Sequence, residues 1–167
     1  MKISELLIPE IHNETRITAA FLKRLPQDKL DWKPHDKSMP MGMLAAHILE
    51  IYGWIVATME TDGIDMANYR PPEVASVEDM VGQLEPNAQA AIKALDKDDS
   101  SYWQDWSMTH GDHVIMKMPR YTTLRSMVLS QFPHHRAQLG LYFRLLDIPV
   151  PASYALSRRK LSLDFKP

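Results

Sequence analysis

The residues best suited to chemistry in this sequence are histidines that stand beside glutamine and glutamate at helical spacing. The stretch SQFPHHRAQLGLYFRLL contains Gln131, His134, His135 and Gln138 within an amphipathic pattern. On a helix, a step of four residues places Gln131 and His135 on one face, roughly one turn apart. Side chains on one face in this way could bind one metal ion. His134 is turned by about 100° from His135, so we expect it at a partly exposed position and not as a ligand of the same ion.

A second candidate pair lies in MLAAHILEIYGW, where His47 stands among apolar residues that recur at helical spacing. Glu50 follows one turn later, near enough to orient the imidazole or to act as a general base. Taken alone, the pattern fits a core histidine satisfied by one hydrogen bond better than a ligand. These residues by themselves leave both interpretations open.

Composition restricts what such a site can contain. The 167 residues suit one domain, 1–167, and they include no cysteine, so any metal must be held by histidine, carboxylate, amide or water. The formal net charge of −2 predicts no general attraction to nucleic acid or to an anionic membrane. The start MKISELLIPE has acids where a secretory signal needs an apolar core, and we therefore expect a cytoplasmic protein.

Four blocks of helical periodicity must position these residues. The pattern predicts helices over about 3–25, 38–60, 76–95 and 122–146, with Ser38 and Ser76 as N-terminal caps. We therefore predict an all-α fold, a four-helix bundle with one long crossover connection.

The long connection, residues 96–120, has two features of its own. Its segment HVIMKM partly alternates and weakly indicates a strand or hairpin. Its aromatic residues suggest a lid packed over the bundle: Tyr102, Trp103 and Trp106.

Pro133 interrupts the last predicted helix. It cannot donate a hydrogen bond to the carbonyl of Leu129, so we expect a kink or a local π-type widening beside the site. One inserted residue turns everything beyond it by about 100°, which would swing His134 toward the direction expected for His135. The simpler alternative is a kink that only curves the helix around the core.

Two segments carry a resemblance to a known family. FLKRLPQDKLDWKPHDKSMPMGMLAAHILEIYGW and HHRAQLGLYFRLLDIPVP resemble the DinB/YfiT-like proteins. The resemblance implies a four-helix bundle that binds a divalent metal through three histidines, one on the second helix and two, four residues apart, on the last. The first matches His47 and the third matches His135, whereas the second falls on Gln131.

That departure leaves three interpretations of the site. His47, Gln131, His135 and waters hold the metal; or the site holds none and its pocket is kept for binding; or His134 replaces the missing ligand. A glutamine oxygen suits nickel or zinc less well than an imidazole nitrogen. We therefore expect these metals to bind weakly or to be absent from the purified protein.

The resemblance also implies an S-transferase whose small-molecule substrate is a low-molecular-weight thiol, or an isomerase-like enzyme that uses a thiol cofactor. Alternatively, the ion could activate water, which would make the protein a metal-dependent hydrolase with Glu50 or His134 as base. The alternative is a non-catalytic bundle that binds a small ligand or a partner subunit; a homodimer is the commonest assembly for such bundles.

Other charged positions have simpler interpretations. Arg136 and Arg144 can hold an anionic group, but on a helix they are more often solvated or paired at the surface. His110 and His113 form a turn more often than a metal clip, and the basic run 157–160 is expected to be solvated.

Overall fold

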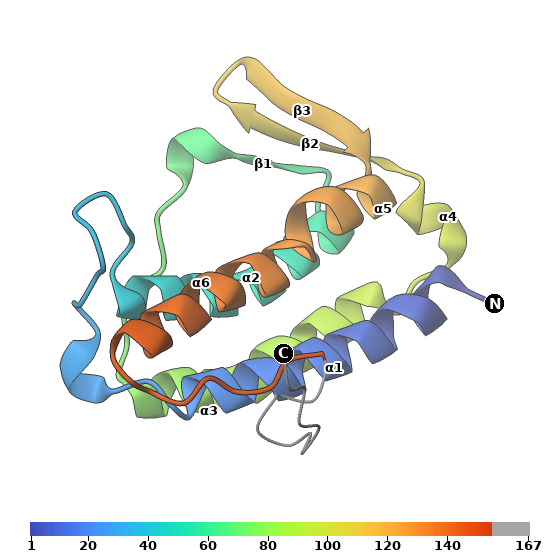
Figure 1. Ribbon diagram of the computed structural model, residues 1–167. Helices are drawn as coiled ribbons and strands as arrows, with labels where there is room; N and C mark the ends of the chain where they lie inside the picture. Colours follow the sequence, from blue (N-terminus) through green and yellow to red (C-terminus); the bar gives the residue numbers. More distant parts are fainter. Residues whose placement is uncertain (155–167) are drawn as a thin grey trace, which may run out of the picture.

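The computed structural model describes residues 1–154 and shows the mostly helical fold that the periodicity predicts. The basic run 157–160 and the end of the predicted domain 1–167 lie outside the described residues. The longest helices contact one another as a closed set, because α1 and α2 each pack against both α3 and α6 (Figure 1). The helices are α1 (Ile3–Leu22), α2 (Met41–Glu60), α3 (Val77–Leu95), α4 (Asp99–Tyr102), α5 (Arg120–Thr123) and α6 (Gln131–Leu145).

The N-terminal cap predicted from the sequence is correct for α3 and wrong for α2. Ser76 caps α3 as predicted, because its side chain accepts a hydrogen bond from the backbone N–H of Asp79. Helix α2 begins at Met41, later than the predicted cap at Ser38. Pro40 takes the N-cap position instead, and its carbonyl accepts the first bond, from the N–H of Leu44.

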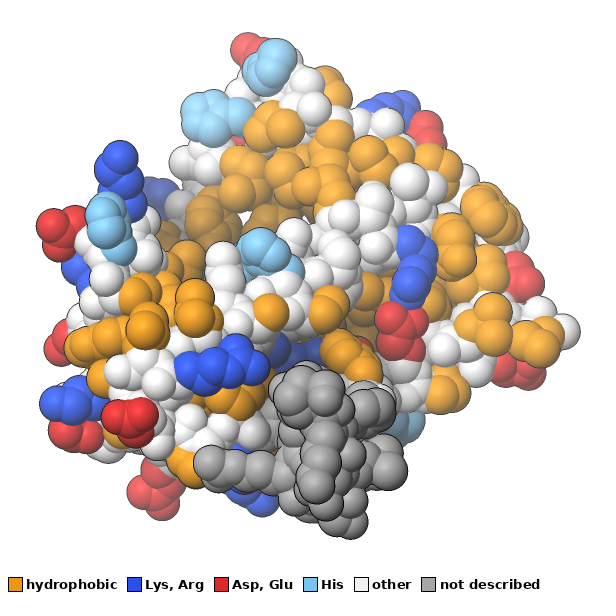
Figure 2. All heavy atoms as spheres, viewed as in Figure 1, with side chains coloured by type: hydrophobic (Ala, Val, Ile, Leu, Met, Phe, Trp, Pro, Cys, Tyr) orange, Lys and Arg blue, Asp and Glu red, His pale blue; other side chains and the backbone are white. Residues whose placement is uncertain are grey.

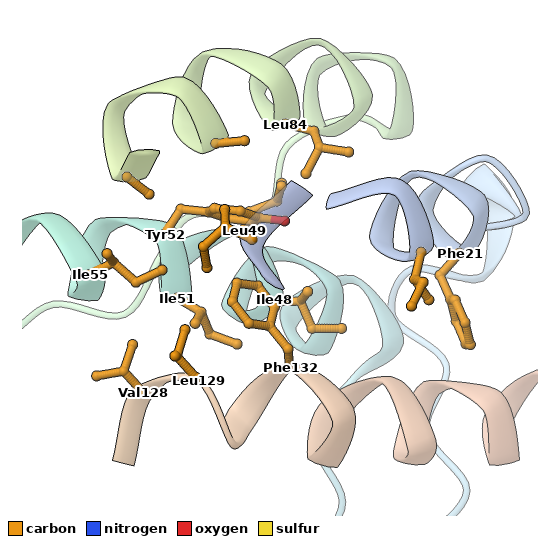
Figure 3. Close-up of a cluster of buried hydrophobic side chains, with 14 of the residues drawn as sticks. Phe21, Ile48, Leu49, Ile51, Tyr52, Ile55, Leu84, Val128, Leu129 and Phe132 are labelled. Atoms are coloured by element: carbon orange, nitrogen blue, oxygen red, sulfur yellow. The ribbon is translucent and has the colours of Figure 1, made fainter. Parts of the chain in front are cut away.

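Helix α2 supplies the centre of the hydrophobic core (Figure 3). By length and composition it is apolar enough to cross a membrane, with a mean hydropathy of 1.3, but 61% of that apolar window is buried inside the protein. Tyr52 shows how the core is joined: its ring packs against Phe132 at 4.9 Å, and its hydroxyl donates to the Thr15 hydroxyl. Burial of α2 therefore fixes its position relative to both α1 and α6.

A three-stranded sheet departs from the strictly all-α fold that we predicted. The strand weakly indicated by HVIMKM is confirmed as β3 (His113–Pro119), which pairs antiparallel with β2 (Asp105–His110). Strand β1 (Gly63–Asp65) joins the other edge of β2 in parallel. Trp106 anchors the sheet, because its ring is fully buried and its indole N–H donates to the carbonyl of Ala57 in α2. The long crossover is thus a packed layer beside the helices (Figure 1).

The last predicted helix is interrupted ahead of Pro133, as we expected. A π-helical segment, Leu124–Val128, follows α5, and the N–H of Leu129 donates to the carbonyl of Leu124, five residues back. Regular α-helix resumes at Gln131. The predicted distortion is confirmed, and it lies ahead of the candidate ligands, so the step from Gln131 to His135 remains within one regular helix.

Candidate metal-binding site

Helices α2 and α6 bring the two key imidazoles together. The ring centroids of His47 and His135 lie 4.6 Å apart, with the rings inclined at 75°. Gln131 lines the same pocket as both histidines. The structure therefore places His47, Gln131 and His135 around one pocket.

The His47 imidazole is held by a carboxylate. Its Nδ1 lies 2.6 Å from Glu50 Oε2, and the same oxygen accepts a hydrogen bond from the hydroxyl of Tyr69. A carboxylate can only accept, so Nδ1 carries the proton and Nε2 keeps a free lone pair. Burial, with the hydrogen bond and charge of Glu50, raises the pKa of Tyr69 to about 12, which keeps that hydroxyl a donor.

His135 is arranged in the same way. Its Nδ1 lies 3.0 Å from the amide oxygen of Gln138, which leaves the lone pair on Nε2. That Nε2 is buried and has no hydrogen-bond partner within the part of the chain that the structure describes. Burial lowers the pKa of His135, and His47 and His134 lower it further, so the ring favours its neutral form. A buried acceptor without a partner is costly, and it fits an ion or a ligand atom at this point.

The donors are fewer than the family pattern implies. In residues 1–154, no group of three histidines and acids is placed to hold a metal ion. His134 stands beside the site, with its ring 4.8 Å from that of His135, but it is exposed and does not line the pocket. Two imidazole nitrogens and the amide of Gln131 are thus the donors present, and such a set would hold a borderline divalent ion less strongly than three imidazoles.

The two arginines considered for anion binding lie elsewhere. Arg144 is exposed, as expected. Arg136 is not at the surface, which corrects our prediction: only 2% of it is exposed, and its guanidinium pairs with the carboxylate of Glu14 in α1. It also donates to Thr18 and Tyr154. The reason is position, because Arg136 occupies the α6 face that packs on α1.

Helices and sheet together line the pocket. Its volume is about 320 Å³, and most of its lining is apolar. Beyond the two histidines and Gln131, its walls are formed by Ile51, Trp54, Trp106, Met108, Thr123, Met127 and Val128.

The predicted aromatic lid forms only in part. Trp106 lines the pocket, whereas Trp103 is exposed. Tyr102 is buried, and its hydroxyl donates a hydrogen bond to the carbonyl of Leu95. His110 and His113 form the last pair of the hairpin around its turn, which confirms the turn interpretation.

Sequence reasoning missed Tyr69, the second partner of Glu50. Tyr69 follows the short 3-10 turn Met66–Asn68, in an irregular segment without periodicity. Nothing in such a segment signals that its side chain reaches α2.

Taken together, these features define a mostly helical protein with a pair of facing imidazoles beneath a small sheet. The sequence model of the DinB superfamily matches residues 10–130, so the chain belongs to this family. The match covers His47 and Glu50 and ends before Gln131 and His135. No curated protein matches the sequence significantly.

Solved structures agree with the family. A DinB-like protein from Bacillus cereus ATCC 10987 superposes with a TM-score of 0.71 at 19% identity, over 92% of this chain and 98% of that one. The DinB-like protein YjoA from Bacillus subtilis gives 0.69 at 14% identity, over 89% and 97%. At these identities the likeness establishes the fold alone.

Proposed function

We propose that this DinB-like helical bundle binds a divalent metal, zinc or nickel, through His47, Gln131 and His135, and acts on a small molecule there. The observation that carries the proposal is the buried Nε2 of His135, which stands beside the His47 ring and has no partner among the described residues. Both imidazoles have their Nδ1 held by a neighbour one turn away, the arrangement that orients metal-ligating histidines.

The metal, when bound, would supply Lewis acidity that lowers the pKa of a thiol or a water. The chain's own residues contribute position and exclusion of water. Glu50 and Gln138 fix the tautomers of the two histidines, and the apolar walls limit solvent. This supports an S-transferase that uses a low-molecular-weight thiol or, failing that, a hydrolase.

The role of a base is proposed for Glu50 or His134. Glu50 already accepts two hydrogen bonds, from His47 and Tyr69, which favours an orienting role for it. His134 is exposed next to His135 and is therefore better placed to exchange a proton with solvent.

A second candidate function is non-catalytic binding of a small ligand or a partner subunit. The neutral amide of Gln131, in place of a third histidine, favours it. In either case we infer a cytoplasmic protein, and we propose a homodimer on the general preference of such bundles.

The test is calorimetric titration of zinc and of nickel into protein treated with EDTA. We expect saturable binding of one ion per chain, lost in His47→Ala and retained in His134→Ala, the adjacent exposed histidine. An absence of binding by the wild type, or equal binding by His47→Ala, would remove the metal from the proposal.

A further inference from the structure

The pocket next to the imidazoles is polar at one end and mostly apolar along the rest of its length. His47, Gln131 and His135 share one end of it. The rest is formed by aromatic, aliphatic and thioether side chains from α2, the sheet and the π-helical segment, together with Thr123 of α5. Figure 2 shows hydrophobic side chains gathered in the region between the β-hairpin and the helices below it. A ligand here meets a hydrophobic chamber that ends in nitrogen and amide donors.

Two hydrogen-bonding side chains of the chamber walls, Trp106 and Thr123, already donate to backbone carbonyls. Trp106 presents only its ring, because its N–H is bonded to the carbonyl of Ala57. The hydroxyl of Thr123 bonds to the carbonyl of Pro119 within its own turn. Ile51, Met108 and Val128 have no strong hydrogen-bonding group in their side chains. A polar substituent packed against these five side chains would therefore lose its water and gain no hydrogen-bond donor.

Among residues 1–154, no lysine, arginine, aspartate or glutamate lines the chamber. Arg136 is committed to Glu14 on the opposite side of α6, facing α1. Arg120, also buried, is committed to Gln104 and to Asp62. The body of a ligand thus finds no fixed charge with which to pair, and burying an unpaired charge is costly.

The chamber's volume sets the size of its ligand. A cavity of roughly 150 Å³ lined by aliphatic and aromatic residues accommodates benzene. The present pocket, at about 320 Å³, is about twice that size. Two fused rings, or an aliphatic group of the same bulk, fit this space. Met108 and Met127 can adapt to the outline of the ligand, because the methionine side chain is flexible and polarizable.

We propose that the pocket takes a neutral, apolar molecule about the size of two fused rings, with one donor atom directed at the imidazoles of His47 and His135. Phosphate esters, and molecules whose body carries a carboxylate or an ammonium group, are excluded. The direction of the donor atom rests on the proposed function, whereas the character of the chamber does not.

The test uses metal-free protein labelled with 13C at its methionine methyl groups. Met108 and Met127 report on the chamber, and the other nine of the eleven methionines report on the rest of the molecule. The probes are 2-naphthol, 2-naphthoate and 2-naphthylmethylammonium at neutral pH, one shape with three charges. We expect 2-naphthol to shift the two reporter signals, and to bind about ten-fold or more tightly than either ion.

A positive charge placed inside the chamber should remove most of this preference for naphthol over naphthoate. Met108→Lys is expected to raise the ratio of naphthoate to naphthol affinity by about ten-fold or more. Ile115→Lys is the matched control, because it adds the same charge at an exposed position of β3 that does not line the pocket, and it should leave the ratio unchanged.

Equal or tighter binding of either ion by the wild type would overturn the inference. So would shifts confined to methionines outside the pocket, or no shift with any probe. Failure of the proposed function is read separately, from the zinc and nickel titrations. Selective naphthol binding without metal binding would retain the apolar chamber and reject the metal.

Discussion

Restoring the third imidazole is the perturbation that addresses the proposed site most directly. Gln131 begins α6 and lies one turn before His135 in regular helix, beyond the π-helical segment. Its side chain already lines the pocket that His47 and His135 share. Gln131→His therefore places a third nitrogen donor beside the other two without moving the backbone.

The size of the effect can be estimated. Loss of even an outer-shell partner costs about 10–100-fold in metal affinity, so gain of a direct imidazole ligand should be worth at least this. Under saturating zinc, the gain adds roughly 1.4–2.7 kcal/mol to the free energy of unfolding. For a chain of 167 residues, each kcal/mol raises the Tm by about 2–4 °C, so the extra rise should be about 3–11 °C.

The assay is thermal unfolding of EDTA-treated protein with and without zinc, supported by calorimetric titration. Ser130→His is the matched control: it adds the same residue one position earlier, at an exposed site that does not line the pocket. We expect the additional zinc-dependent rise for Gln131→His only. A rise of similar size in the control, or none in Gln131→His, would show that this pocket is not where the metal binds.

Two further predictions concern the neighbours of the site and the core. Glu50→Ala removes the group that holds His47 Nδ1, and should weaken zinc binding by about 10–100-fold in the same titration, with a smaller loss for Tyr69→Phe. Arg136→Met leaves the Glu14 carboxylate buried without its cation, and should cost about 3–5 kcal/mol in urea unfolding. The double variant with Glu14→Leu should recover most of that loss; equal destabilisation of both variants would contradict the pairing.

The meeting of the two histidines was predicted from the family resemblance, which matches His47 and His135 to ligands of one metal, and helical spacing by itself placed only Gln131 and His135 on one face. His47 stands on an apolar stripe of α2, and a step of four residues separates Gln131 from His135. Once two such helices pack, residues on their facing sides must come close. The hairpin was accessible only weakly, since HVIMKM alternates over too few residues to distinguish a strand from an irregular loop.

Arg136 was misjudged although a signal existed. It lies in the series Phe132, Arg136, Leu139 and Phe143, whose spacing is that of a buried helical face, and all four are buried. Glu14 lies at a corresponding position on α1. Opposite charges on two apolar stripes indicate a buried pair between helices, whereas a charge considered on one helix alone suggests the surface. Tyr69 offered no comparable signal, because its approach to Glu50 depends on the path of an irregular segment.

The π-helical segment explains why residues before and after the interruption of the last helix line one pocket. In an ideal α-helix, the twelve residues from Thr123 to His135 accumulate a turn of about 120° beyond whole revolutions, which would point the two side chains in different directions. One residue accommodated in the wider π turn takes back about 100° of this rotation. Thr123, Met127, Gln131 and His135 consequently line the same pocket. The distortion ahead of Pro133 thus leaves His135 as the imidazole that faces His47. It also places Thr123 of α5 in the wall of the same pocket.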